Sequence, residues 1–325
     1  MNKKVLVTGA TGFIGNYTVR HLLDSGYTVS VLVRPESLAQ ASSEAFHSEI
    51  RIFEGDLLDP DSLEAAFRDQ DAVVHAAALV SFRPEDKSRL TRINVEGTAN
   101  VVNTCLDQHI PHLVHISSIA ALGGQPGQEW FDETAIWVKN NRHTPYAETK
   151  YQAELEVWRG KAEGLNVSIL NPSLVIGPWL PGHHSMKIFT HNLPFYPSGG
   201  NGLVDVRDVA EAVRSCLDLK VYDERIILNG HNLSYKEMLD RLAMYKGKKG
   251  PPIALPKSLA VAAGQLIGLL NRILKRNTVF QPRLLHSVFS KAGFDNTKSI
   301  ELLGLKYRPV DESILAVLQG LTVNG

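Results

Sequence analysis

A tyrosine and a lysine lie four residues apart in the stretch TPYAETK, residues 144–150. On a helix, Tyr146 and Lys150 would share one face, one turn apart. A free tyrosine has a pKa of about 10, which makes it a poor base at neutral pH. A nearby ammonium group favours the phenolate and lowers that pKa. The pair is therefore predicted to exchange a proton with a substrate hydroxyl or carbonyl oxygen.

A second polar group precedes this pair in HISSIAALGG, residues 115–124. Ser118 comes just past an expected strand, at the edge of an open α/β sheet where ligands bind. Its hydroxyl is placed to donate a hydrogen bond to the same reacting oxygen. Ser117 and Ser118 suit loop capping equally well, and a Tyr/Lys pair is common by chance. The chain has a glycine-rich turn first, then the serine at a strand end, then the Tyr/Lys pair. This order of the three features indicates a catalytic site.

The elements that must position these residues are short β-branched runs alternating with segments of helical periodicity. Strands are expected at residues 4–8, 28–33, 50–56, 71–77, 111–117, 166–172 and 225–230. Helices are expected at residues 12–26, 60–69, 86–109, 145–163 and 205–219. This alternation predicts an α/β fold, a Rossmann doubly wound parallel sheet with helices on both faces.

Beyond residue 172, Pro/Gly-rich loops and further helical segments replace this alternation. We therefore expect residues 1–172 to form a cofactor-binding domain, joined by a returning segment near 203–230. Residues 173–325 are expected to form mainly a smaller, mostly helical substrate-binding lobe.

Three glycines stand three residues apart in VTGATGFIG, residues 7–15, directly after the first expected strand. Glycines let a backbone turn tightly and approach a phosphate, and a helix N-terminus favours negative charge. The alternative is a tight strand–helix turn without a ligand. The residues expected to hold a dinucleotide here are Gly9, Thr11, Gly12, Phe13, Ile14 and Gly15.

The end of the second strand indicates which cofactor binds. An acidic residue there suits NAD, whereas an arginine accommodates the 2′-phosphate of NADP. The run TVSVLVRPES carries Arg34 and no acid at the strand end. A guanidinium group can hold a phosphate with two hydrogen bonds. NADP is therefore the predicted cofactor, and NAD is the alternative. If Arg34 has no functional role, it is simply a solvated charge at the end of the strand.

Two further stretches suit a dinucleotide. In EGDLLD, Asp56 and Leu57 follow the third strand, where the carboxylate could accept a hydrogen bond from adenine. Asp56 is also a candidate N-cap for the next helix. In HAAALV, Ala76, Ala77 and Ala78 are small enough to let backbone pass close to a ribose, although such a run also suits buried strand packing.

Several stretches together resemble the extended short-chain dehydrogenase/reductases over residues 4 to about 215. They are TGATGFIG, GDL, HAAA, NVEGT, SS, YAETK and NPSLVIGP. TVSVLVRPES and LNPSLVIGPW resemble the branch of dihydroflavonol reductases, cinnamoyl-CoA reductases and hydroxysteroid dehydrogenases. The resemblance implies that Tyr146 gives or takes a proton, assisted by Lys150, which also binds the ribose, and Ser118. It places Pro172 and Ser173 near the nicotinamide.

Three functions compete. The first is an NADP-dependent oxidoreductase that moves a hydride between nicotinamide and a carbonyl or alcohol. The second is a nucleotide-sugar epimerase or dehydratase with tightly bound NAD, for which Arg207 is a phosphate ligand candidate. Such enzymes tend to carry an arginine where Trp179 stands. Trp179, Phe189, Phe195 and Tyr196 favour an apolar substrate or are ordinary core. The third, a non-enzymatic NADP-binding regulator, often lacks the Tyr/Lys pair.

Other polar residues have a structural interpretation. Asn94 is locally unfavourable inside a helix, and either packing or a water relay would explain it. His75, His115, His183 and His184 lack the spacing of metal ligands, so no metal site is expected.

The composition limits the kinds of partner that the protein is expected to bind. Lys+Arg and Asp+Glu both number 34, which argues against a nucleic-acid or membrane-surface ligand. Cys105 and Cys216 are expected to be free thiols in the cytoplasm. The apolar stretch 258–274 is short for a membrane span and is expected to be a packed helix, with a membrane-surface helix as the alternative. The resemblance further implies a homodimer on the 86–109 and 145–163 helices and a small-molecule substrate.

Overall fold

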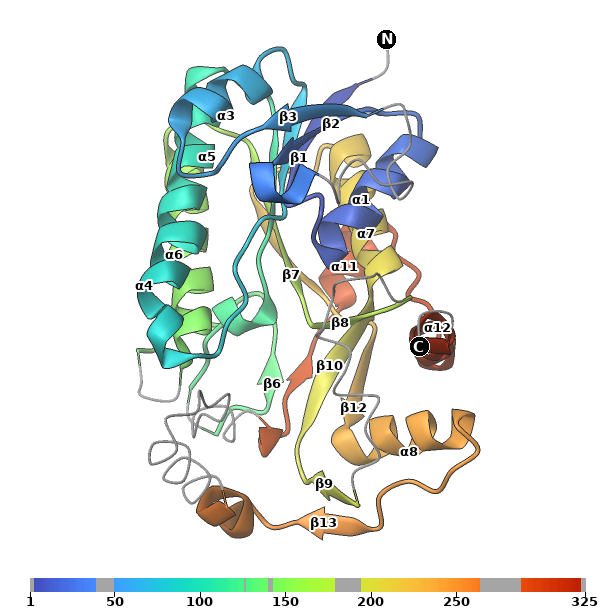
Figure 1. The fold of residues 1–325 in the computed structure, drawn as a ribbon. Helices are drawn as coiled ribbons and strands as arrows, with labels where there is room; N and C mark the ends of the chain where they lie inside the picture. The colour runs from blue at the N-terminus through green and yellow to red at the C-terminus, as the bar shows by residue number, and fades with distance from the viewer. Residues whose placement is uncertain are drawn as a thin grey trace.

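The computed structural model describes residues 3–38, 50–125, 127–139, 143–178, 194–263 and 288–322. Its centre is a seven-stranded parallel sheet in the order β11-β7-β5-β4-β1-β2-β3 (Figure 1). The strands are β1 (Lys4–Thr8), β2 (Thr28–Val33), β3 (Arg51–Glu54), β4 (Ala72–His75), β5 (Leu113–Ile116), β7 (Val167–Pro172) and β11 (Glu224–Leu228).

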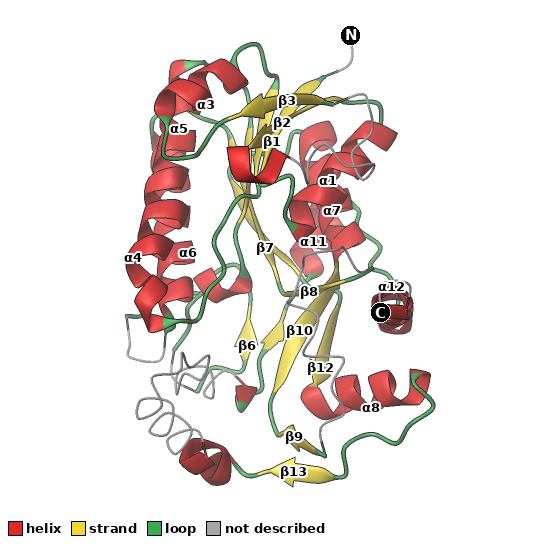
Figure 2. Cartoon of the chain, in the orientation of Figure 1, coloured by secondary structure: helices red, strands yellow, loops and turns green. Residues whose placement is uncertain are grey.

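Helices cover both faces of this sheet (Figure 2). One face packs against α1 (Phe13–Asp24), α7 (Val206–Leu219) and α11 (Thr297–Leu303). The other packs against α3 (Pro60–Phe67), α5 (Gly97–Asp107) and α6 (Pro145–Ala162), with α4 (Lys87–Leu90) beside α6. The predicted doubly wound Rossmann sheet is confirmed.

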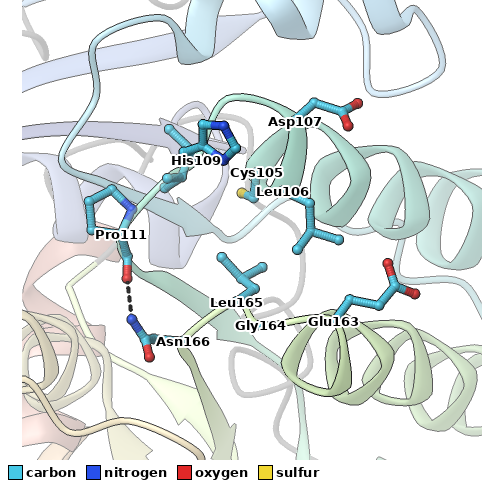
Figure 3. A pocket seen from close by; sticks show the side chains of 10 residues that line it. Cys105, Leu106, Asp107, His109, Pro111, Glu163, Gly164, Leu165 and Asn166 are labelled. Atoms are coloured by element: carbon cyan, nitrogen blue, oxygen red, sulfur yellow. Dashed lines mark hydrogen bonds between the residues drawn. The ribbon is translucent and has the colours of Figure 1, made fainter.

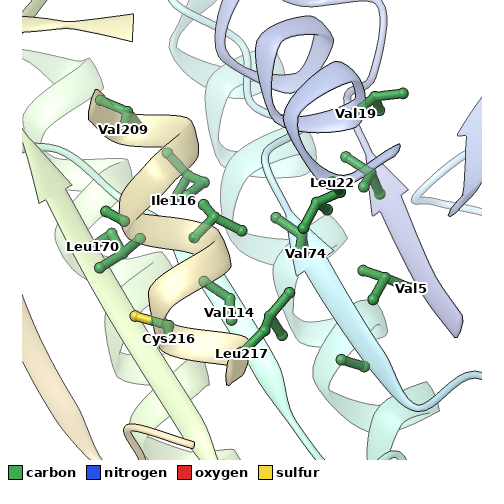
Figure 4. Packing of buried hydrophobic residues seen from close by; sticks show 14 of the residues in the cluster. Val5, Val19, Leu22, Val74, Val114, Ile116, Leu170, Val209, Cys216 and Leu217 are labelled. Carbon is green, nitrogen blue, oxygen red and sulfur yellow. The ribbon is translucent and has the colours of Figure 1, made fainter. Parts of the chain in front are cut away.

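The strands are apolar on both faces because both faces are covered. Val5 and Val7 of β1 pack toward α1 and α7, while Leu6 between them packs toward the α3–α6 layer. Figure 4 shows the first of these clusters, with Cys216 of α7 among the aliphatic side chains. Full burial of one such aliphatic side chain contributes about 1.5–3 kcal/mol.

The expected strands and helices are confirmed, with boundaries shifted by up to a few residues. The 86–109 helix differs most, because it is divided into α4, a π-helical turn at Thr91–Glu96, and α5. A π-helical turn inserts one extra residue per turn and is frequent at functional sites. Here it carries Asn94 into the interior, where 2% of its surface is exposed.

Three smaller sheets complete the fold, and all of their strands except β6 follow β7 in the chain. The first contains β8 (Leu174–Ile176), β10 (Gly200–Asp205) and β12 (His231–Ser234), next to α8 (Tyr235–Tyr245) and α12 (Val310–Thr322). The others pair β6 (Trp130–Phe131) with β14 (Gly293–Phe294) and β9 (Phe195–Pro197) with β13 (Ile253–Leu255). α7 and β11 return to the large sheet. The domain limits at residues 172 and 203–230 stay predictions.

Some expectations lie outside the described residues, namely those on Trp179, His183, His184, Phe189 and most of the 258–274 stretch. Within the described ranges, no helix combines the length and hydropathy needed to cross a membrane. Cys105 and Cys216 are both buried free thiols, as expected.

Candidate active site

The predicted site residues converge on the carboxyl edge of the parallel sheet. The chain adds β2 and β3 on one side of β1 and then crosses to β4 on the other, so the strand order reverses between β1 and β4. Ligands of open α/β sheets bind at such a reversal, outside the carboxyl ends of the strands. The glycine loop follows β1, Ala76 to Ala78 follow β4, Ser118 follows β5, and Ser173 follows β7.

The glycine loop packs its own backbone against two neighbours. Gly9 has a φ of +71°, and a Cβ atom there would lie 2.5 Å from the amide nitrogen of Ala77. A Cβ atom at Gly15 would lie 2.1 Å from the carbonyl oxygen of Gly9. Glycine at these positions is thus required by the close approach of β1, β4 and α1, whether or not a ligand binds.

The first turn of α1 suits an anion. Its N-cap is Gly12, which offers no capping side chain, and its first turn contains no acidic residue. The positive end of the helix dipole therefore faces the loop without a protein carboxylate to neutralise it. This arrangement fits the pyrophosphate of a dinucleotide.

Arg34 lies directly after β2, at the place expected for a residue that selects the cofactor. Its guanidinium forms an ion pair with Glu36 at 3.0 Å, and both side chains are at least half exposed. An exposed pair of this kind contributes little free energy, so Arg34 is accessible to a 2′-phosphate. Asp56 accepts a hydrogen bond from the Leu58 amide at 2.8 Å. The N-cap of α3 is Asp59 rather than Asp56.

The predicted catalytic residues lie together. The Ser118 side chain lies near enough to Tyr146 to lower its pKa, and it accepts a hydrogen bond from the Ala120 amide at 3.1 Å. Ser118 thus has the loop-capping role and lies beside Tyr146. The Nζ atom of Lys150 donates to the carbonyl oxygen of Ile116 at 2.8 Å, two residues before Ser118.

The start of α6 fixes the position of Tyr146. Thr144 is the N-cap and accepts a hydrogen bond from the Ala147 amide at 3.1 Å. Pro145 occupies the first helical position, where its missing N–H costs nothing. Tyr146 and Lys150 then fall on the inner face of the first two turns.

Burial controls the pKa of both residues in the protein without cofactor. It raises the pKa of Tyr146 to about 12, and the nearby Ser118 side chain opposes this effect. Burial lowers the pKa of Lys150 to about 8, and the charge of Glu154 opposes it. Tyr146 is therefore a protonated phenol at neutral pH. The lowering of its pKa by Lys150 stays a prediction.

Asn94 connects the loop after β4 to α6. Its Oδ1 atom accepts a hydrogen bond from the Leu79 amide at 2.7 Å. Its Nδ2 atom donates to the Leu79 carbonyl at 3.0 Å and to the Thr149 hydroxyl at 3.1 Å. Thr149 is the neighbour of Lys150. These contacts show the packing role that the sequence offered, and the water relay remains untested.

Two buried histidines lie under Lys150 on the same face of the sheet. The Thr98 hydroxyl donates to the Asn94 carbonyl, so it accepts from His75 Nε2, which leaves His75 Nδ1 to accept from Thr8. His115 packs against His75 with a ring-centroid distance of 5.2 Å. Burial lowers the pKa of both rings, His75 to about 3. Among the described residues, no group of three candidate ligands surrounds a metal position.

Sequence reasoning missed two residues beside the catalytic group. Phe82 places its ring edge-on against Tyr146, with centroids 5.9 Å apart. Glu154 is buried and accepts hydrogen bonds from Ser117 and Asn171. Glu154 follows Lys150 by four residues, so helical spacing alone could have placed it on the same face. No local pattern marks Phe82.

The stretch WFDETA lies at the junction of two sheets. Trp130 and Phe131 form β6, and Phe131 stacks on Phe294 of β14 at 5.5 Å. Glu133 accepts a hydrogen bond from the Ile227 amide of edge strand β11 at 2.8 Å. The stretch therefore stabilises the end of the large sheet.

A cavity of about 650 Å³ lies at the opposite edge of the sheet (Figure 3). Its walls follow the ends of α5 and α6 and include Cys105, His109 and Glu163. There Asn166 donates a hydrogen bond to the Pro111 carbonyl at 2.8 Å. Because this cavity borders the amino ends of β5 and β7, it is separate from the catalytic residues.

The fold and this group of residues define a dinucleotide-dependent enzyme of the Rossmann class. Residues 5–222 match the model of the NAD dependent epimerase/dehydratase family. The "Putative dihydroflavonol 4-reductase" of Synechocystis sp. is 32% identical over 82% of this chain and 80% of its own. Cinnamoyl-CoA reductase 1 of Petunia hybrida is 34% identical over 64% of this chain and 67% of its own.

The solved structure of gox2253 has a TM-score of 0.85 and 28% identity, covering 100% of this chain and 99% of that one. The chain belongs to the NAD-dependent epimerase/dehydratase family of extended short-chain dehydrogenase/reductases. It is an NAD(P)-dependent oxidoreductase acting on CH–OH groups.

Proposed function

We propose that the protein is an NADP-dependent reductase of a small, apolar carbonyl compound. The observation that carries this proposal is the buried Lys150, which lies one helical turn after Tyr146 and whose Nζ atom donates to the Ile116 carbonyl at 2.8 Å, two residues before Ser118. Phe82, edge-on against Tyr146, gives the site an aromatic wall without charge. The relatives named as dihydroflavonol 4-reductase and cinnamoyl-CoA reductase support a reductase.

Two observations at the cofactor site support a bound dinucleotide. The N-terminus of α1 lacks a capping side chain and an acid. The Oγ atom of Ser173 is buried without a hydrogen-bond partner among the described residues, which suits a ligand amide. We propose that Arg34 holds the 2′-phosphate, Asp56 and Leu57 the adenine, and Pro172 and Ser173 the nicotinamide.

A bound nicotinamide supplies the hydride to the carbonyl carbon. The chain's own residues handle the oxygen. Tyr146, a neutral phenol, donates its proton to the oxygen as negative charge develops there. Ser118 donates a hydrogen bond to the same oxygen. Lys150 then stabilises the phenolate left on Tyr146 by its charge, and the product is an alcohol.

The epimerase alternative needs a cation for a sugar diphosphate. The guanidinium of Arg207 is already bound to Asp205 at 2.8 and 2.9 Å and to Glu312 at 3.1 Å. Because this guanidinium already binds two carboxylates of the protein, it is a poor ligand for a sugar diphosphate, which favours the reductase. Purified protein that retains NAD and interconverts nucleotide sugars would support the epimerase instead.

The proposal extends to organisation and location. We propose that residues 1–172 with 203–230 bind the cofactor and that 173–325 mainly bind substrate. The outer layer of α4, α5 and α6, where the Leu155 side chain is 47% exposed, is proposed as a homodimer surface. The two buried free thiols suit a cytoplasmic location.

The test is Tyr146→Phe with NADPH or NADH and a panel of aldehydes, ketones and nucleotide sugars. We expect the native enzyme to oxidise NADPH with an apolar carbonyl compound. The variant should bind NADPH with unchanged affinity by fluorescence, because it loses one hydroxyl remote from the phosphates. Its turnover should fall by about 10²–10⁴-fold. Full turnover by the variant would contradict the assignment of Tyr146.

A further inference from the structure

Helix α6 buries two charged side chains in the stripe that faces the sheet. Lys150 is 2% exposed and Glu154 is 1% exposed. The other members of this stripe are Pro145, Ala147, Thr149, Ala153, Val157 and Gly160. Taking a charged group out of water costs several kcal/mol unless other groups compensate. Lys150 has a place in the proposed reaction, whereas Glu154 has none so far.

Among the described residues, the polar groups that contact the Glu154 carboxylate are two hydrogen-bond donors and a cation. Its Oε1 atom accepts from the Ser117 hydroxyl at 2.5 Å and from the Asn171 amide at 2.6 Å. Its Oε2 atom lies 3.8 Å from Nε of Arg225, on edge strand β11. Hydrogen bonds and a cation favour the charged form of a carboxyl group. Burial raises the pKa of Glu154, and these contacts oppose that effect, so they favour an ionised carboxylate.

The two hydrogen-bond donors, Ser117 and Asn171, both connect Glu154 to Ser118. Ser117 immediately precedes Ser118 in the loop after β5. Asn171 donates a second hydrogen bond, at 2.9 Å, to the backbone carbonyl of Ser118. Asn171 also precedes Pro172 in β7. One carboxylate oxygen on α6 thus fixes the Ser118 loop against β7, and three separate elements meet at this point.

The charge of Glu154 acts on Lys150. On the sheet beneath Lys150, His75 and His115 are neutral because burial lowers their pKa values. Tyr146, one turn earlier on α6, is a neutral phenol, and Arg225 is a cation that lies 3.8 Å from the Glu154 carboxylate. Burial favours the neutral amine of Lys150, and Glu154 is the acid whose charge raises its pKa.

We propose that Glu154 is a positioning residue of the reaction, whose carboxylate holds the Ser118 loop through Ser117 and Asn171 and keeps Lys150 charged beside Tyr146. This inference rests on the proposed function of Ser118, Tyr146 and Lys150. It assigns two separable effects to one side chain. The hydrogen bonds set the position of the Ser118 hydroxyl, and the negative charge sets the protonation of the Lys150 amine.

The first test measures the charge on protein without cofactor. Lysine labelled with ¹³C at Cε is titrated by NMR, and the Lys150 signal is assigned by its loss in Lys150→Arg. In Glu154→Gln we expect the Lys150 midpoint to fall by about one pH unit or more. Glu156→Gln removes the same charge from the same helix, where Glu156 pairs with Arg159, and should leave the midpoint unchanged. An unchanged midpoint in Glu154→Gln overturns the charge effect.

The second test measures turnover with NADPH and the best carbonyl compound of the panel. In Glu154→Gln, kcat should fall about tenfold or more with little change in KM, because positioning affects the transition state. The alkaline limb of the kcat profile should move to lower pH, together with the NMR midpoint. A profile and kcat equal to those of Glu156→Gln overturn the positioning role, even if the variant melts at a lower temperature.

Ser117→Ala separates the two effects and covers the case in which Glu154→Gln fails to fold. It removes one hydrogen bond to the carboxylate and keeps the charge. We expect kcat to fall while the Lys150 midpoint stays in place, and an unchanged kcat overturns the hydrogen-bond effect. If no carbonyl compound is reduced, the proposed function fails, whereas the NMR titration still decides the influence of Glu154 on Lys150.

Discussion

Tyr146 owes its protonation state to its surroundings more than to its helix neighbour. Without cofactor, burial raises its pKa to about 12, so the side chain enters a reduction as an acid. The nearby Ser118 side chain acts in the opposite direction and lowers this pKa, and it therefore assists the loss of the proton. The residue scale thus explains why a serine from β5 accompanies a tyrosine from α6.

Arg34 allows a prediction at the same scale. In Arg34→Ala we expect KM for NADPH to rise about 10- to 100-fold, which corresponds to the loss of a hydrogen bond to a charged group. KM for NADH should change less than about threefold, because NADH lacks the 2′-phosphate. Steady-state kinetics with both cofactors measures the difference.

Arg51→Ala is the matched control, because Arg51 lies on neighbouring strand β3 and stacks on Phe53. This variant also removes one positive charge, but at the amino end of β3, whereas Arg34 follows the carboxyl end of β2. It should leave both KM values unchanged. Equal losses for NADPH and NADH in Arg34→Ala would argue against a 2′-phosphate contact and in favour of a structural role.

At the scale of elements, the cofactor loop depends on three segments that meet backbone to backbone. The loop after β1 touches the loop after β4 at Gly9 and the start of α1 at Gly15. The π-helical turn contributes Asn94, which fixes the loop after β4 to α6. The catalytic residues and the cofactor loop are therefore connected through hydrogen bonds and packed backbone.

Gly9→Ala tests this connection. A Cβ atom would overlap the Ala77 backbone at 2.5 Å, where no flexible side chain can give way. We expect the overlap to destabilise the protein by about 1–3 kcal/mol, in addition to the strain of a positive φ. NADPH affinity should fall as well. Urea unfolding and fluorescence titration measure the two effects.

Gly26→Ala is the control, because Gly26 has a φ of +83° and a Cβ atom there meets nothing within 4 Å. It keeps the backbone strain and removes the overlap. Equal unfolding free energies for the two alanine variants would show that the close approach of β1 and β4 does not matter.

For the whole molecule, buried neutral histidines link stability to pH. His75, His112 and His115 have 4% exposure or less, and burial lowers all three pKa values, that of His112 to about 4. The unfolded chain protonates its histidines near pH 6.5. It then binds more protons than the folded protein, so the free energy of unfolding falls as the pH falls below about 6.5.

The contribution of His112 to this loss of stability at low pH can be measured. It hydrogen-bonds with the Ser168 hydroxyl at 2.7 Å. The depressed pKa predicts a loss of about 3 kcal/mol between pH 6.5 and 4. In His112→Asn the contribution of this ring should disappear, so the unfolding free energy should depend less steeply on pH. Urea unfolding at pH 7.5, 6.5, 5.5 and 4.5 measures the slope.

His109→Asn serves as the comparison, because His109 is exposed. Its φ of +52° is one that asparagine tolerates. The slope should match that of the native protein. A native slope in His112→Asn would mean that this ring does not contribute to the acid sensitivity.

The sequence alone determined the features that depend on local spacing. The alternation of strands and helices predicted the parallel sheet, and the four-residue spacing placed Tyr146 and Lys150 on one face of α6. These features were predictable because a helix or strand period fixes which side chains share a face. The glycine loop followed from the same local order of strand, turn and helix.

The tertiary structure decided what distant segments contribute. Glu154 meets Ser117 and Asn171 because strand order brings β5 and β7 side by side under α6. Arg207, a phosphate ligand candidate by sequence, is bound to Asp205 and Glu312 instead. The contacts of Glu154 and the pair of Arg207 with Glu312 join residues 17 to 105 positions apart, and no local period encodes them. Burial, which sets the pKa values of the catalytic pair, likewise exists only in the folded chain.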